Sequence, residues 1–192
     1  MKIIKNFVNK TYHSEIHDLL NGISFPWYYN HDISYGNKKD NSLYNFGFSH
    51  VFLDESGFRK SLETSFIQPL LFNIMDAINC YTIIRARADM TMASPNNYQH
   101  PPHVDFVYKN ISTIFYVNDS DGDTILYKNK KVFKKITPVK NSLLIFDGDI
   151  LHTGCSPTKY KNRILINSNY RREKWVLKKI SIVLLKMPSI KI

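Results

Sequence analysis

Four segments decide the fold: HVD at residues 103–105, TIFYVN at 113–118, LLIFDGDILH at 143–152 and RILIN at 163–167. Short apolar runs rich in β-branched and aromatic residues predict strands. Two residues able to bind a metal are separated by one position in the first segment. A third ends a buried strand, and an arginine follows inside the last one.

The second half of the chain predicts a mainly β structure. Turn residues such as Asp119–Gly122 and Asp147–Asp149 separate the apolar runs. Short strands at this spacing are typical of a sandwich or barrel. We expect strands at 81–92, 113–118, 124–127, 132–138, 142–146, 152–155 and 163–170.

Residues 1–80 predict a helical support for these strands. An apolar piece at 3–8 resembles a strand, and Ser14 is the expected N-cap of a first helix. A second helical pattern covers 58–80, where Pro69 is expected to break the helix or begin its second piece. The predicted class is α+β, mainly β, with N-terminal helices that buttress one sheet.

Length and charge limit the alternatives. The 192 residues fit a single domain, with helical support at 1–80, a core at 81–170 and a basic C-terminal extension at 171–192. Lysine and arginine exceed aspartate and glutamate by a net charge of +10. This surplus favours a polyanion partner, although it is equally consistent with a role in solubility alone.

Cysteines and hydropathy indicate the compartment. Cys80 and Cys155 lack metal-binding spacing, and we interpret them as buried thiols in a reducing compartment. No signal-peptide pattern and no run long enough to span a bilayer is visible. We therefore expect a cytoplasmic protein without a membrane span.

His103 and Asp105 can bind one metal ion from the same side, because residues i and i+2 of an extended segment point the same way. His152 can join them from the end of a strand. Two imidazoles and one carboxylate on one face are characteristic of non-haem Fe(II) enzymes, which keep positions open for cosubstrate and dioxygen. A structural zinc site would need a fourth ligand.

Arg163 stands inside an apolar strand. A buried arginine is rare unless it is paired, and its planar fork fits a carboxylate. The expected partner is the distal carboxylate of 2-oxoglutarate, whose other end would chelate the iron. An ordinary Asp or Glu partner is the alternative.

At these residues the chain resembles the 2-oxoglutarate/Fe(II) dioxygenase superfamily, in its prolyl-4-hydroxylase-like branch, over about 81–170. FPWYY at 25–29 and RILINSNY at 163–170 are similar to bacteriophage oxygenases, which would place the enzyme in the host cell cytoplasm. The resemblance implies a distorted double-stranded β-helix, or jelly roll, with Fe(II), 2-oxoglutarate and O2 as cofactors and cosubstrates.

The resemblance also implies roles for individual residues. His103, Asp105 and His152 match metal ligands, and Arg163 matches the residue that holds the 2-oxoglutarate tail. Two further cosubstrate-pocket residues are implied: Tyr116, which donates a hydrogen bond to the same carboxylate, and Thr124, which lines the pocket.

One position departs from the family pattern. Relatives offer a tyrosine or asparagine to the cosubstrate from the strand before the HxD motif, whereas this chain offers Asp89. Its charge would repel an anion unless Arg87 compensates or Asp89 turns elsewhere.

The implied activity is oxidative decarboxylation of 2-oxoglutarate to succinate, coupled to C–H hydroxylation of a small-molecule or peptide substrate, for example a prolyl peptide. One alternative is a demethylase-like oxygenase that acts on nucleic acid, and another is a non-catalytic jelly-roll binding protein. The nucleic-acid alternative depends on the lysines at 128, 130, 131, 134, 135 and 140.

Overall fold

The computed structural model describes residues 1–33 and 42–171. The elements in chain order are β1 (Lys2–Lys5), α1 (Lys10–Asn21), β2 (Tyr28–Asn30), β3 (Gly47–Leu53), α2 (Thr64–Ile78), β4 (Thr82–Met92), the short 3-10 turn η1 (Pro95–Asn97), β5 (Ile111–Tyr116), β6 (Thr124–Lys128), β7 (Lys131–Ile136), β8 (Ser142–Asp147), β9 (His152–Gly154) and β10 (Asn162–Arg171). The predicted C-terminal extension lies outside the described residues from 172 onward.

Two antiparallel sheets form the β core. The large sheet has the strand order β1-β8-β5-β10-β4-β3-β2, and the small sheet has the order β7-β6-β9. The two sheets enclose a small hydrophobic cluster, in which Tyr116 and Leu165 of the large sheet meet Leu126 and Ile136 of the small one. The predicted mainly β jelly roll with N-terminal helices is confirmed.

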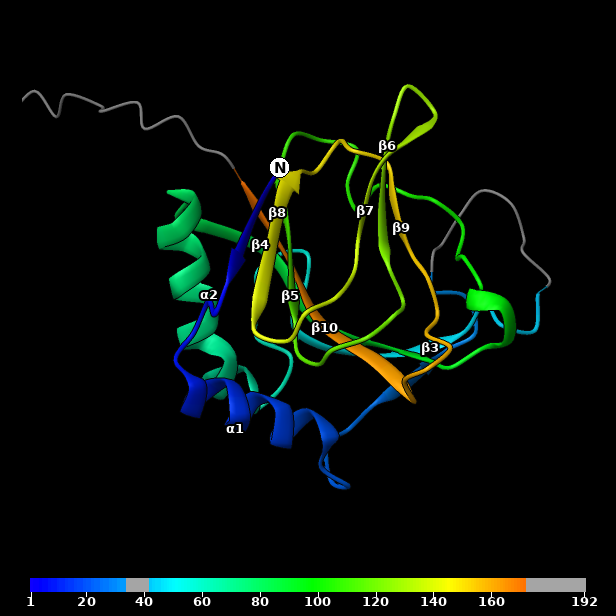
Figure 1. Ribbon diagram of the computed structural model, residues 1–192. Coiled ribbons are helices and arrows are strands. Elements are labelled where there is room, and N and C mark those ends of the chain that lie inside the picture. Colours follow the sequence, from blue (N-terminus) through cyan, green and yellow to red (C-terminus); the bar gives the residue numbers. More distant parts are fainter. Residues whose placement is uncertain (34–41, 172–192) are drawn as a thin grey trace, which may run out of the picture.

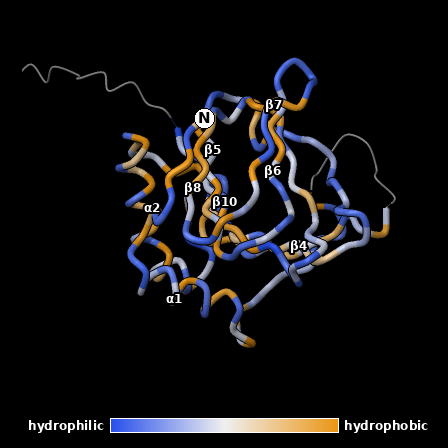
Figure 2. The backbone as a smooth tube through the Cα atoms, in the orientation of Figure 1, coloured by the Kyte–Doolittle hydropathy of each residue, from blue (hydrophilic) through white to orange (hydrophobic). Residues whose placement is uncertain are grey.

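The helices cover the face of the large sheet that points away from the small sheet (Figure 1). Ile16 and Leu20 of α1, together with Ile67 and Leu71 of α2, are buried in the main hydrophobic cluster with residues of β4, β5 and β10. Hydrophobic stretches follow the central strands, whereas the tip of the β6–β7 hairpin is hydrophilic (Figure 2). The small sheet therefore lies on the face of the large sheet that the helices leave uncovered.

The start of α1 differs from the prediction. The helix begins at Lys10, and its N-cap is Asn9, whose side chain accepts a hydrogen bond from the backbone N–H of Tyr12 at 2.8 Å. Ser14 lies within the first turns instead. Asparagine and serine cap helices about equally well, so the sequence pattern did not distinguish them.

The second helix passes through Pro69 without a break, contrary to the prediction. The hydroxyl of Tyr12 donates to the carbonyl of Phe66 at 2.7 Å and accepts from the N–H of Leu70 at 3.2 Å. These are groups of the α2 backbone on either side of the proline. The Tyr12 hydroxyl from α1 thus partly replaces the helical hydrogen bonding that proline disrupts.

The register of β4 and β10 arranges the face that meets the small sheet. Antiparallel partners directly opposite each other share one face. The pairs on this face, taken along the strands, are Thr91 with Arg163, Asp89 with Leu165, Arg87 with Asn167, and Arg85 with Asn169. The alternate residues Ala86 and Ala88 pack into the main hydrophobic cluster on the helix side. Charged and polar groups thus form a row between the two sheets.

Candidate active site

His103 and His152 lie side by side because their backbones pair. The N–H of each residue donates to the carbonyl of the other at 2.9 Å, and the ring centroids are 4.8 Å apart. This isolated bridge joins the segment after η1 to β9. Residues far apart in the sequence are therefore fixed as neighbours by the main chain.

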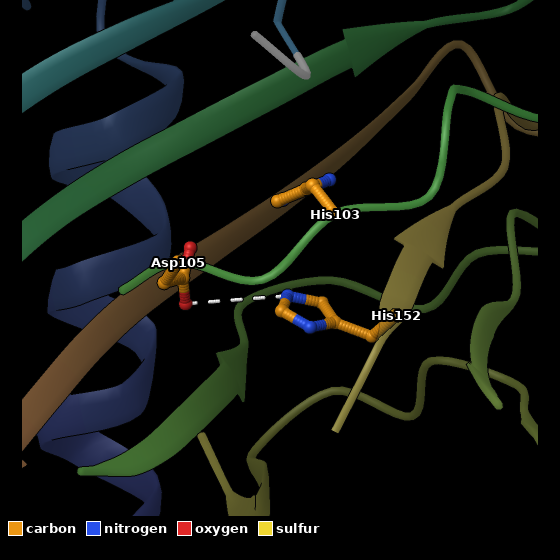
Figure 3. Close-up of side chains that lie close together, drawn as sticks. All are labelled: His103, Asp105 and His152. Atoms are coloured by element: carbon orange, nitrogen blue, oxygen red, sulfur yellow. Dashed lines mark ion pairs between the residues drawn. The ribbon is translucent and has the colours of Figure 1, made fainter. Parts of the chain in front are cut away.

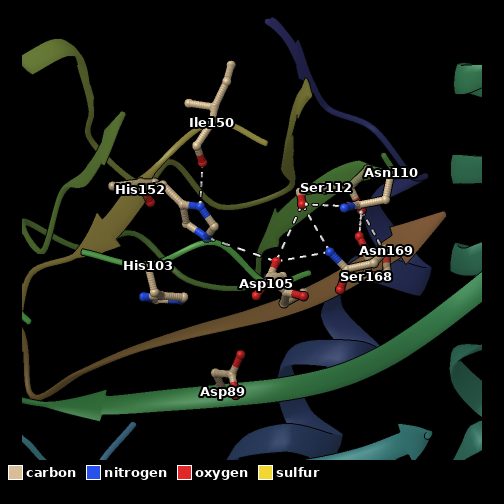
Figure 4. A network of polar contacts seen from close by, with 12 residues as sticks. Asp89, His103, Asp105, Asn110, Ser112, Ile150, His152, Ser168 and Asn169 are labelled. Atoms are coloured by element: carbon tan, nitrogen blue, oxygen red, sulfur yellow. Dashed lines mark hydrogen bonds and ion pairs between the residues drawn. The ribbon is translucent and has the colours of Figure 1, made fainter. Parts of the chain in front are cut away.

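Both imidazoles present the same nitrogen to this site. Nδ1 of His103 lies 3.3 Å from the carbonyl of Pro101, and Nδ1 of His152 lies 3.0 Å from the carbonyl of Ile150. A carbonyl only accepts, so each Nδ1 donates its hydrogen, and Nε2 is the nitrogen whose lone pair a neutral ring would offer to a metal. Figure 4 shows the ring of His152 held in this way between Ile150 and Asp105.

Asp105 completes the predicted set. Its side chain is 2% exposed, and Oδ2 lies 4.0 Å from Nε2 of His152 (Figure 3). One candidate ligand atom from each of His103, Asp105 and His152 lies within 4.8 Å of the others. The structure thus brings together the residues predicted as metal ligands.

The carboxylate of Asp105 is surrounded by donors. Its Oδ1 accepts from Arg85 Nη2 at 2.9 Å, while its Oδ2 accepts from Asn169 Nδ2 at 2.9 Å and from Asn167 Nδ2 at 3.3 Å. Burial opposes ionisation, but His152, Arg85 and Arg87 outweigh it and hold the pKa of Asp105 well below its usual value. The carboxylate is therefore negatively charged and fixed in orientation.

His103 is kept in its neutral form. Burial, and then the neighbouring His152, lower the pKa of His103 from 6.5 to about 4. Neutral imidazole is the form that binds metal ions. Among the residues that the structure describes, these three form the one cluster of His, Cys, Asp or Glu side chains suited to a metal. Two imidazoles and one carboxylate fit Fe(II) with positions left open.

Arg163 lies at the other end of the same space. Its side chain is buried, and Nη2 donates to Thr124 Oγ1 at 2.7 Å. The same hydroxyl oxygen accepts from Tyr116 at 2.7 Å, so Tyr116, Thr124 and Arg163 form one hydrogen-bonded group, while their role toward the cosubstrate stays a prediction. Gly154 leaves room for the guanidinium, because a Cβ there would lie 3.0 Å from Nη1.

The charge of Arg163 has no acidic partner. Within residues 1–33 and 42–171 the guanidinium takes part in no ion pair, and its Nε is buried without a hydrogen bond. Burial lowers its pKa. A buried cation of this kind favours an incoming anion, and its planar fork matches a carboxylate. The residues present thus fit 2-oxoglutarate as well as the metal.

A pocket connects the two ends. It has an empty volume of about 700 Å³, its open mouth included, and both imidazoles and Arg163 contribute to its wall. The other lining residues come mainly from β3, β4, β9 and β10, and none of those described is a lysine. The lysines of the β6–β7 hairpin are exposed elsewhere, which counts against the nucleic-acid alternative.

Asp89 also reaches this pocket. It points from β4 toward the space beside His103 and Asp105 (Figure 4), and Nε of Arg87 lies 2.9 and 3.0 Å from its two oxygens. Burial raises the pKa of Asp89 against the opposing charges of Arg87 and Arg85. Arg87 thus offsets part of the Asp89 charge, in line with one of the two alternatives given for this departure from the family pattern.

Sequence reasoning missed the residues that hold Asp105. The sequence did not single out Arg85, Asn167 and Asn169. Arg85 and Asn169 lie directly opposite each other in the β4–β10 register, and Asn167 lies on the same face. His13 is not part of the site, because its Nε2 donates to the carbonyl of Val117 at 2.9 Å. His100 is buried and lines the pocket, and its Nδ1 lies 3.2 Å from Asn45 Oδ1.

Comparison with known proteins agrees with this geometry. Residues 90–171 match the sequence model of the 2OG-Fe(II) oxygenase superfamily, and all residues proposed for metal and cosubstrate binding lie in that segment. The fold and the site together define a 2-oxoglutarate-dependent Fe(II) oxygenase. By this match, residues 90–171 carry the sequence pattern of the 2OG-Fe(II) oxygenase superfamily. No curated protein matches the chain in sequence.

Solved structures share the fold. A 2OG-Fe(II) oxygenase family oxidoreductase from Burkholderia pseudomallei superposes with a TM-score of 0.67 at 13% identity, covering 90% of this chain and 85% of that one. A Trichoplax adhaerens prolyl hydroxylase, solved with a hypoxia inducible factor peptide fragment, gives 0.61 at 18% identity, covering 88% and 82%. A Pseudomonas putida prolyl-4-hydroxylase gives 0.53 at 11%, covering 90% and 92%. The similarity to bacteriophage oxygenases stays a prediction.

Proposed function

We propose that this protein is an Fe(II)- and 2-oxoglutarate-dependent dioxygenase that hydroxylates a C–H bond, with His103, Asp105 and His152 as metal ligands. Arg163 is the proposed anchor for the distal carboxylate of 2-oxoglutarate, with Tyr116 and Thr124 beside it. One observation carries the proposal: the two imidazoles of a three-residue ligand set line the same pocket as a buried arginine that forms no ion pair with the described residues.

The protein contributes binding, orientation and exclusion of water. When bound, Fe(II) with 2-oxoglutarate and dioxygen supplies the oxidising chemistry, and 2-oxoglutarate leaves as succinate and CO2. The backbone carbonyls of Pro101 and Ile150 hold each Nε2 toward the metal position. The Thr124 hydroxyl orients the guanidinium of Arg163. The protein groups that would receive the two ends of the cosubstrate are thereby oriented before it binds.

The prime substrate is proposed only as a class. The Trichoplax adhaerens prolyl hydroxylase was solved with a peptide, which supports a peptide or a small molecule that enters the same pocket. The described part of the chain contains no helix long and apolar enough to cross a membrane. Cys80 and Cys155 are both buried, which supports the predicted cytoplasmic location.

A polyanion contact is a separate prediction. All the lysines between residues 128 and 140 are exposed, with Val132 and Phe133 exposed among them. A surface of this kind attracts anions in a salt-dependent way. Because these lysines do not line the described pocket, such a contact would not by itself carry a nucleobase to the metal.

Succinate release tests the proposed function. We expect the purified chain to convert 2-oxoglutarate to succinate only when Fe(II) and dioxygen are both present. Candidate prolyl peptides and free amino acids should raise this rate if they are coupled substrates. Metal removal by a chelator should stop turnover and Fe(II) should restore it. No succinate under any of these conditions would leave the non-catalytic jelly-roll alternative standing.

A further inference from the structure

We propose that Arg85 is a positioning residue for Asp105, and this role rests on the function proposed above. Arg85 is buried on β4, and its Nη2 lies 2.9 Å from Oδ1 of Asp105. It belongs neither to the ligand set nor to the cosubstrate group. Its position behind a ligand makes it a determinant of where that ligand stands.

Asp105 needs side-chain contacts to hold its place. The main chains of His103 and His152 pair with each other, whereas Asp105 lies outside any helix or strand. Strand pairing therefore does not fix its carboxylate. An unsupported carboxylate could rotate, and its two oxygens would then exchange places at the metal position.

Arg85 supplies that support from two directions. Its guanidinium carbon lies 4.9 Å from the ring centroid of Phe106, the residue directly after Asp105. Its Nη2 also donates to Asn169 Oδ1 at 3.1 Å, while Asn169 Nδ2 donates to Asp105 Oδ2 at 2.9 Å. Arg85, Asn169 and Asp105 thus form a closed ring of hydrogen bonds that engages both carboxylate oxygens.

The ring determines which oxygen faces the imidazoles. Oδ1 is engaged by Arg85, whereas Oδ2 is the oxygen 4.0 Å from Nε2 of His152. A carboxylate that offers one oxygen leaves more coordination positions for a chelating keto acid and for dioxygen. The guanidinium charge acts in the opposite sense, since a cation near the site repels a divalent metal ion.

The sign of one affinity change separates these two effects. If Arg85 positions Asp105, Arg85→Met should weaken binding of Mn(II), a stand-in for Fe(II) that resists oxidation, by about 10- to 100-fold. If the arginine were only a nearby charge, Mn(II) would bind more tightly. Titration calorimetry on the full chain measures the affinity, and unchanged or tighter binding overturns the proposal.

Glu55→Gln is the matched control. Glu55 is an exposed acid 3.9 Å from Arg85 Nη1, and it takes no part in the hydrogen bonds of Asp105 described above, so its loss should leave Mn(II) affinity unchanged. Should Arg85→Met fail to fold by circular dichroism, Arg85→Lys keeps the charge but loses the planar fork. It should also bind Mn(II) more weakly, and wild-type affinity in this variant would overturn the proposal.

Failure of the underlying function gives a different result. If the wild-type chain binds no Mn(II), the metal site itself is wrong. If the wild type binds Mn(II) and the Arg85 variants bind it equally well, only the positioning role is wrong.

Discussion

Two buried arginines on the same face of the large sheet have opposite surroundings. Arg85 is 9% exposed and pairs with the carboxylate of Asp105, while Arg163 is 5% exposed and pairs with no acid among the described residues. Both charges cost free energy when buried, yet only the first is compensated within the protein. The difference indicates that one end of the pocket is complete for a metal and the other requires an anion.

The largest effect is expected from the metal end. His152→Ala removes one of the three proposed ligands, and we expect Mn(II) binding and succinate release to fall below detection. His17→Ala is the matched control, because His17 is exposed on α1 and should leave both unchanged. Succinate release by His152→Ala at the wild-type rate would contradict the ligand assignment.

The next effect is expected at the anion end. Arg163→Leu should raise the KM for 2-oxoglutarate by about 100-fold or more, because a buried charge-assisted pair is worth about 2–5 kcal/mol. Mn(II) affinity should stay within about threefold of wild type, because the metal ligands are untouched. A parallel loss of Mn(II) binding would show that the two ends are not separable.

Stability should respond in opposite directions to the two losses. Removing Arg85 leaves Asp105 buried without its cation, so Arg85→Met should lower the free energy of unfolding of the metal-free protein by about 3–5 kcal/mol. Arg163→Leu removes a buried charge that forms no ion pair with the described residues, so the free energy of unfolding should stay the same or rise. Urea unfolding measures both, and equal destabilisation would contradict the comparison.

The two arginines also show how much of the site the sequence could predict. His103, Asp105, His152 and Arg163 were singled out because their chemistry and order are characteristic, and the structure brings the first three together. The strands followed from apolar runs between turn residues. The partners of Asp105 were not found, because Arg85 and Asn169 become neighbours only through the β4–β10 register. Nothing in the local sequence specifies that pairing.

The helices show the same limit. The failure of Pro69 to break α2 depends on the hydroxyl of Tyr12, which reaches it from α1. A local rule for proline cannot include a group that arrives through tertiary packing. The start of α1 was missed for a simpler reason, since Asn9 and Ser14 are both good N-caps and propensity alone does not rank them.

A smaller effect concerns pH. Burial raises the pKa of Asp89, and the charge of Asp105 adds to this rise, whereas the charges of Arg87, Arg85 and Arg163 oppose it. A bound dianion should raise the pKa of Asp89 further. The complex then binds more protons than the free protein. Affinity for 2-oxoglutarate should therefore fall as pH rises through the raised pKa of Asp89, by at most about tenfold per pH unit.

Asp89→Asn provides the check on this effect. Calorimetric titrations of 2-oxoglutarate at several pH values should show tighter binding than wild type and a flatter dependence on pH. An unchanged slope in this variant would mean that another group takes up the proton.

The most direct test compares two ligands in two proteins. Binding of 2-oxoglutarate and of 2-oxobutyrate, which lacks the distal carboxylate, is measured by anaerobic calorimetry on Mn(II)-loaded wild type and Arg163→Leu. The account predicts that wild type prefers 2-oxoglutarate by about 100-fold and that the preference disappears in the variant. Equal binding of the two acids by wild type, or a preference that survives without Arg163, would contradict it.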